Sequence, residues 1–176
     1  MAQDVRTGVV VVGVDGSADA DAALRHGMAE AVRRGGRLRA VIACRPPEIA
    51  LYAYDVSVAP TLGRTLAAAR DAVAERVDAV RSGAGPELAD VPVEPVAVLG
   101  SSVDVLVEAA RHADLLVVGH RGRGSWRSAM FGSTGLGAVL NAPCPVTVVR
   151  VPRTPGRDHL AASGSAAAPL PIGPIA

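Results

Sequence analysis

Apolar, strand-like segments alternate with amphipathic, helix-like segments along almost the whole chain. Five apolar runs rich in β-branched residues predict strands at 9–14, 38–44, 91–99, 115–118 and 145–151. The segments between them predict helices at 18–34, 62–80, 101–112 and 134–140. Strands that alternate with helices are typical of an α/β domain built on a parallel sheet. The length of 176 residues suits one such domain.

The order of the strands follows from the handedness of their connections. Right-handed crossovers let the first three strands step outward in one direction, so the fourth strand must return to the other side of the first. Pro92 and Pro95 also place the third strand at an edge. The sequence therefore predicts an open, Rossmann-like, five-stranded parallel sheet of order 3-2-1-4-5, with helices on both faces. The ligand crevice of such a sheet opens where the order reverses, between strands one and four.

Composition excludes several classes of function. All 18 basic residues are arginine, and without lysine the chain cannot form a P-loop or a Schiff base. The net charge of +1 gives no reason to expect nucleic acid or an anionic membrane as the main partner. Only four aromatic residues are present, too few on one face to stack nucleic-acid bases: Tyr52, Tyr54, Trp126 and Phe131.

Other features bound the compartment and the domain. Cys44 and Cys144 lie on well-separated expected strands, so we expect no disulfide between them. No apolar run reaches the length of a membrane span, so we expect a cytoplasmic protein. The connection at 45–60 is long enough to be a lid, a docking surface or an insertion. A Pro-, Ala-, Gly- and Ser-rich tail at 153–176 is expected to be disordered.

The fourth strand leads into a glycine-rich segment. Val118 and Gly119 end its apolar run, Gly122 follows, and Gly132-Ser133-Thr134 opens the next expected helix. Glycines let the backbone approach a phosphate closely, and a helix N-terminus offers unpaired N–H groups. Asp15 ends the first strand, so the sheet order brings it to the same crevice. The residues therefore predict a nucleotide site, although Asp15 could also be a turn residue, and the glycines could form only a turn and an N-cap.

The spacing Gly119-x2-Gly122-x9-Gly132-Ser133 resembles the signature of the ATP-binding branch of the universal stress protein family, over residues 6–152. The resemblance implies an adenine nucleotide alpha hydrolase-like fold with ATP in the crevice. It implies that the carboxylate after strand one meets the nucleoside and that the backbone near Val41 meets the adenine edge. Val118 and Gly119 would flank the ribose. The phosphates would be received by Gly122, Gly132, Ser133 and Thr134.

Neighbouring residues allow more than one reading. Arg121, Arg123 and Arg127 could pair with phosphates or form a solvated basic loop. His120 could act as a base or point outward from the loop, and Gly124 could simply loosen it.

Asp15 could help hold Mg²⁺, but the sequence offers no second carboxylate in a fixed relation to it and no evident base. The residues therefore indicate nucleotide binding more than catalysis. The resemblance implies a stress-response regulator with at most slow ATP hydrolysis, which forms a homodimer through the strand at 145–151. The alternatives are a dimeric interaction module that binds another adenylate such as cAMP or has a vestigial site, and a slow Mg²⁺-dependent ATPase.

Overall fold

The computed structural model describes residues 8–45, 59–122 and 132–151. Most of the connection at 45–60, residues Arg123, Gly124 and Arg127, and the tail at 153–176 lie outside the described residues. No helix in the described ranges is both long enough and apolar enough to cross a membrane.

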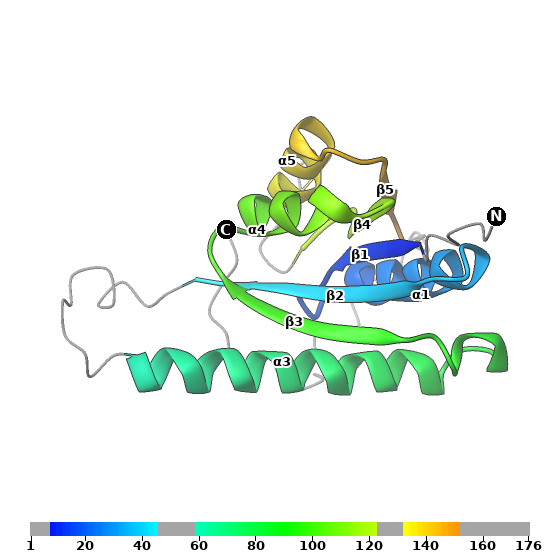
Figure 1. Cartoon of the computed structure of the whole chain (residues 1–176), viewed down its shortest axis with the longest axis horizontal. Coiled ribbons are helices and arrows are strands. Elements are labelled where there is room, and N and C mark those ends of the chain that lie inside the picture. Colours follow the sequence, from blue (N-terminus) through cyan, green and yellow to red (C-terminus); the bar gives the residue numbers. More distant parts are fainter. Residues whose placement is uncertain (1–7, 46–58, 123–131, 152–176) are drawn as a thin grey trace, which may run out of the picture.

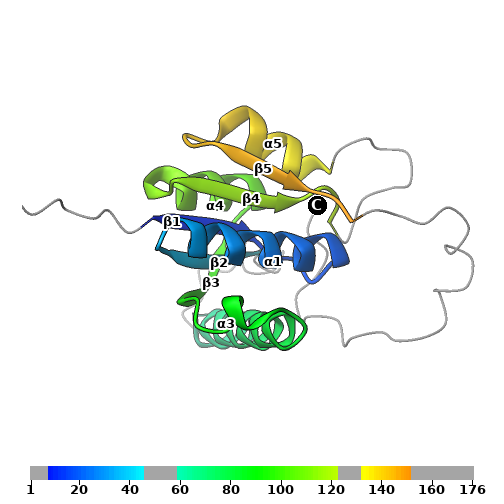
Figure 2. The same ribbon diagram turned by 90° about the vertical axis from the view of Figure 1, so that its right-hand side faces the viewer.

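The strands form one five-stranded sheet of order β3-β2-β1-β4-β5 (Figures 1 and 2), which confirms the predicted order. Every neighbouring pair is parallel, so the carboxyl ends of all strands lie at one edge. No strand end differs from its expected position by more than two residues. The observed strands are β1 Val9–Gly13, β2 Arg37–Cys44, β3 Val93–Leu99, β4 Leu115–Gly119 and β5 Val146–Val149.

Helices cover both faces of the sheet (Figure 1), as expected. On one face lie α1 (Ala18–Arg33), α3 (Ala59–Ser82) and the short 3₁₀ helix η2 (Pro86–Leu88). On the other lie α4 (Ser102–Ala109), which continues as the 3₁₀ helix η3 (Ala110–His112), and α5 (Ser133–Asn141). The sequence placed α4 and η3 in a single helix and made α3 a turn shorter than it is.

The core has two layers because β1 is buried on both faces. Val10 and Val12 are fully buried among side chains of α1, α3 and β2 on one side. Val11 is fully buried on the other, in a cluster that includes side chains of α4 and α5. This double burial explains why the strand is an almost continuous run of valines with no polar alternation.

Strand β3 pairs with β2 and forms one edge of the sheet, as its prolines predicted. Pro95 stands within β3 opposite Ala40. A proline lacks the N–H group of an inner strand but is tolerated at an edge.

The two cysteines are free thiols, as expected. They belong to different layers of the core, Cys44 to the α1 side and Cys144 to the α4 side. Burial raises the pKa of both thiols above the usual value, which keeps them protonated near neutral pH.

Candidate functional site

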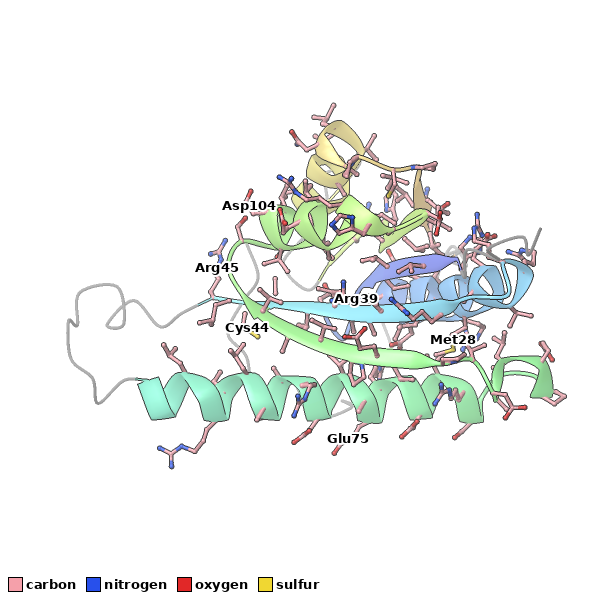
Figure 3. All side chains as sticks on the ribbon, in the orientation of Figure 1. Met28, Arg39, Cys44, Arg45, Glu75 and Asp104 are labelled. Atoms are coloured by element: carbon pink, nitrogen blue, oxygen red, sulfur yellow. The ribbon has the colours of Figure 1, made fainter. Side chains whose placement is uncertain are left out.

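A pocket lies at the carboxyl ends of β1, β2 and β4 and at the start of α5. Its empty space is about 780 Å³, a figure that includes solvent at its open mouth. The structure brings all eight predicted site residues into its lining: Asp15, Val41, Val118, Gly119, Gly122, Gly132, Ser133 and Thr134. In Figure 3, Cys44 and Arg45 mark the end of β2, and Asp104 marks the first turn of α4.

Asp15 is held by the turn that joins β1 to α1. Its Oδ1 accepts the N–H of Ser17 at 2.9 Å, and Gly16 between them has a φ of 79°, which favours glycine. Its Oδ2 lies 2.6 Å from the position that a Cβ on Gly122 would occupy. The absence of a side chain at 122 therefore lets the aspartate and the loop after β4 approach each other.

A second residue of the same turn reaches that loop. The Ser17 hydroxyl accepts the N–H of Ala20 at 3.2 Å as the N-cap of α1, and it donates to the Arg121 carbonyl at 3.3 Å. The sequence does not indicate this contact, which is made across 104 positions of the chain.

Asp19, in the first turn of α1, is a functional candidate that the sequence did not indicate. It is only 8% exposed. Its Oδ2 accepts the Arg121 N–H at 3.1 Å, and its Oδ1 accepts the Val151 N–H at 3.3 Å. One carboxylate thus fixes both the loop after β4 and the chain that leaves β5.

Gly119 is required by packing as well as by its place in the pocket. A Cβ there would lie 2.9 Å from the backbone carbon of Asp19 and 3.1 Å from the Ala20 nitrogen. The glycine therefore allows the first turn of α1 to pack against the end of β4.

Helix α5 begins without a side-chain cap. Gly132 is the N-cap residue, with φ −65° and ψ 146°, and makes no side-chain hydrogen bond. The first intrahelical bond runs from the Leu136 N–H to the Gly132 carbonyl, at 3.0 Å. The N–H groups of Ser133, Thr134 and Gly135 therefore have no partner within the helix, and all three residues line the pocket. We expected α5 to begin at Thr134, but Ser133 is its first residue.

The backbone of β2 meets the pocket on the side opposite α5. The N–H of Val14 donates to the Val41 carbonyl at 2.8 Å, so this carbonyl already has a partner in the sheet. Alternate residues of β2 bond to alternate neighbours: Arg37 and Val41 bond toward β1, while Leu38 and Cys44 bond toward β3. Ala43 therefore directs its backbone groups toward β1, beyond the point where β1 ends at Gly13, and it too lines the pocket.

The remaining candidates separate into two groups. Arg121 is half-buried and lines the pocket. His120 is not in its lining, but its N–H donates to the Val149 carbonyl at 2.7 Å, and its carbonyl accepts the Gly132 N–H at 3.1 Å. Its backbone thus joins β5 to the start of α5.

Metal-binding side chains do not cluster in the described ranges: no group of three or more His, Cys, Asp or Glu is found there. Asp15 is the carboxylate in the pocket lining. One carboxylate fits the way Mg²⁺ binds beside a nucleotide, where phosphates and waters supply most of the ligands.

Known proteins similar to this chain belong to one family. The model of the universal stress protein family matches residues 7–150. A universal stress protein of Thermus aquaticus is 35% identical over 144 residues, which are 80% of this chain and 97% of that protein. Universal stress protein Rv2624c of Mycobacterium tuberculosis is 36% identical over 141 residues, 80% of this chain and 47% of that protein. The chain spans about half the length of such mycobacterial relatives.

Two solved structures are also similar. Universal stress protein UspA from Lactobacillus plantarum has a TM-score of 0.62 and 26% identity, and the match covers 82% of this chain and 99% of that one. A universal stress protein solved in complex with cAMP has a TM-score of 0.52 and 27% identity, over 82% of this chain and 97% of that one. Sequence and structure agree that this chain belongs to the universal stress protein family.

Proposed function

We propose that the chain is a nucleotide-binding regulator of the stress response, and that its ligand is an adenine nucleotide with ATP as the first candidate. The observation that carries the proposal is a single pocket that contains both Asp15 and the uncapped start of α5. It lies at the switch point of the sheet, where open α/β folds bind their ligands. The similar structure solved with cAMP supports an adenylate ligand.

The α5 side of the pocket would receive the phosphates. The N–H groups of Ser133, Thr134 and Gly135 are not used within the helix, and the helix dipole favours negative charge there. Arg121 adds a positive charge to the lining. A hydrogen bond to a charged group contributes roughly 1.5–3 kcal/mol, so a few such bonds suit micromolar binding, which needs about 8 kcal/mol.

The β2 side would receive the base. A backbone N–H and carbonyl at the end of a strand can pair with the edge of a purine, as the next strand would. We place this edge at Ala43, because Val41 on the same side of β2 already bonds to Val14. Val41, which also lines the pocket, would lie beside the base. Asp15 lies between the two ends and would meet the nucleoside and, with the phosphates, Mg²⁺.

We also propose that the protein acts as a homodimer through β5. This strand is the other edge of the sheet, and all four of its residues are half-buried in the isolated chain. Helix α5 adds an exposed apolar stripe beside it: Leu136 (49% exposed), Val139 (50%) and Leu140 (72%). An apolar edge strand favours pairing with another strand.

Calorimetric titration of the purified chain with ATP, ADP and cAMP tests the proposed ligand. We expect micromolar binding of at least one of the three, and tighter ATP binding with Mg²⁺ than with EDTA. The absence of binding by all three would contradict the proposal. Release of phosphate from ATP in the same samples, compared with an Asp15→Ala variant, separates a slow ATPase from a protein that only binds.

A further inference from the structure

Ser102 carries a buried hydroxyl that the fold leaves without a partner. The residue is 8% exposed, and its Oγ makes no hydrogen bond to any described residue. It also lines the pocket. Buried polar groups in proteins almost always have a hydrogen-bond partner, so an exception in a pocket wall points to a ligand.

The helix that contains Ser102 does not need this hydroxyl. Ser101 is the N-cap of α4: its Oγ accepts the Asp104 N–H at 3.2 Å and donates to the Asp104 Oδ2 at 2.6 Å. Ser102 is the first residue inside the helix, a position where the side chain has no capping role. The local structure therefore gives no reason for a buried hydroxyl at 102.

The backbone ties the start of α4, and with it Ser102, to the end of β2, where we place the base. Gly100, two residues earlier, donates its N–H to the Cys44 carbonyl at 2.9 Å, which fixes the start of α4 to the end of β2. Ala43 is the residue immediately before Cys44 in β2. The proposed phosphate end lies across β1, at α5 and the loop after β4.

We propose that the Ser102 hydroxyl forms a hydrogen bond with the base of the bound nucleotide and helps to select that base. This inference rests on the proposed function. A hydroxyl both donates and accepts, so it can pair with a ring nitrogen or with the exocyclic amino group of a purine. Ser102 would thus add a side-chain contact to the backbone edge at Ala43.

Titration of ATP into wild type, Ser102→Ala and Ser101→Ala tests the inference. We expect Ser102→Ala to weaken ATP binding about 2- to 10-fold, the range for loss of one hydrogen bond. Ser101→Ala is the matched control, because it removes a neighbouring hydroxyl that caps α4 but does not line the pocket. We expect it to lower the melting temperature and to leave ATP affinity unchanged.

Four analogues identify the base atom: the triphosphates of 1-deaza-, 3-deaza- and 7-deaza-adenosine and of purine riboside. We expect one of them to bind wild type and Ser102→Ala equally, because it already lacks the partner of the hydroxyl. Equal ATP affinity of wild type and Ser102→Ala would overturn the inference, as would an equal loss with every analogue. If wild type binds ATP and Ser102→Ala does so equally, only this inference fails. If wild type binds no adenylate, the proposed function fails and this inference with it.

Discussion

Asp19 joins the two chain segments that follow the carboxyl ends of β4 and β5. Its two oxygens accept N–H groups from Arg121, in the loop after β4, and from Val151, after β5. The residue is buried beneath Gly119, whose missing Cβ makes room for it. We therefore expect the position of Arg121, in the loop after β4, to depend on this carboxylate, although Asp19 does not line the pocket.

Replacement of Asp19 by alanine should lower both stability and ATP affinity. The change leaves two N–H groups without their acceptor, which we expect to cost about 1–3 kcal/mol of unfolding free energy. Asp21→Ala is the control, since Asp21 lies in the same turn but pairs with Arg76 of α3 (Nε–Oδ1 2.6 Å). Urea denaturation should show a loss for both variants, while calorimetry shows weaker ATP binding for Asp19→Ala alone. Equal ATP affinity of the two variants would refute the positioning role.

Residue type and chain position were enough to place Asp15 and the glycines in the pocket lining, because Asp15 and Gly122 follow strands, Gly119 ends one and Gly132 opens the next helix. Asp19 could not be predicted in this way. An acidic residue in the first turn of a helix commonly just favours the helix dipole, and its partners here are 102 and 132 positions away. The choice of Ala43 over Val41 as the residue proposed to meet the base depends on where β1 ends. The apolar run 9–14 does not define that end to one residue.

Among the elements, α5 combines a structural weakness with the proposed binding role. Its N-cap is a glycine with no capping side chain, where serine or aspartate would be more stabilising by a few tenths of a kcal/mol. A capping oxygen would take the N–H groups of the first turn, which we assign to the phosphates. Stability and binding therefore favour different residues at 132.

Gly132→Ser should separate these two effects. Serine would cap α5 and stabilise it by a few tenths of a kcal/mol, so the melting temperature should stay the same or rise by about 1 °C. ATP affinity should fall severalfold, because the new hydroxyl competes for the N–H groups. Gly132→Ala adds a Cβ without an acceptor, at 3.4 Å from the His120 carbonyl oxygen, and separates bulk from capping. Unchanged ATP affinity in Gly132→Ser would argue against phosphate binding at α5.

The elements themselves were largely predictable from periodicity and from their end signals. Ser17 and Ser101 cap α1 and α4, serine being one of the residues preferred at a helix start. The prediction of one α-helix over 101–112 was wrong in the last turn. There the chain forms the 3₁₀ helix η3, whose hydrogen bonds join residues three apart instead of four. Such changes of helix type leave no clear mark in an apolar pattern.

For the molecule as a whole, the sheet edge at β5 is where we propose that two copies pair. The Pro145 carbonyl accepts the Leu116 N–H at 3.0 Å, and the Val149 carbonyl accepts the His120 N–H at 2.7 Å. The odd-numbered residues of β5 therefore bond to β4, and the backbone groups of Val146 and Val148 point outward. A second copy of the chain can extend the sheet at β5 through these outward groups.

Val148→Pro should abolish the proposed dimer while keeping the bonds to β4, because it removes an outward N–H. Val148→Ala is its control, since it removes the same side-chain contacts but keeps that N–H. Sedimentation at micromolar concentration should give a dimer for wild type and Val148→Ala, and a monomer for Val148→Pro. A monomeric wild type, or a dimeric Val148→Pro, would exclude pairing through β5.

The order of the sheet was predictable because handedness rules leave few choices once strands and helices alternate. The same rules brought Asp15 and Gly119 to one crevice from positions about a hundred residues apart. They could not supply the side-chain contacts that shape the pocket, such as the Leu106 methyl group 2.9 Å from where a Cβ on Gly13 would lie. Contacts of that kind depend on how far each helix turns over the sheet.

The most direct test of nucleotide binding compares two glycine substitutions by ATP calorimetry. A Cβ on Gly122 would lie 2.6 Å from the Asp15 Oδ2, whereas a Cβ on Gly63, exposed in α3, would meet nothing within 4 Å. We predict that Gly122→Ala weakens ATP binding at least tenfold, which is about 1.4 kcal/mol, and that Gly63→Ala binds like wild type. Equal ATP affinity of wild type, Gly122→Ala and Gly63→Ala would contradict a nucleotide site between Asp15 and α5.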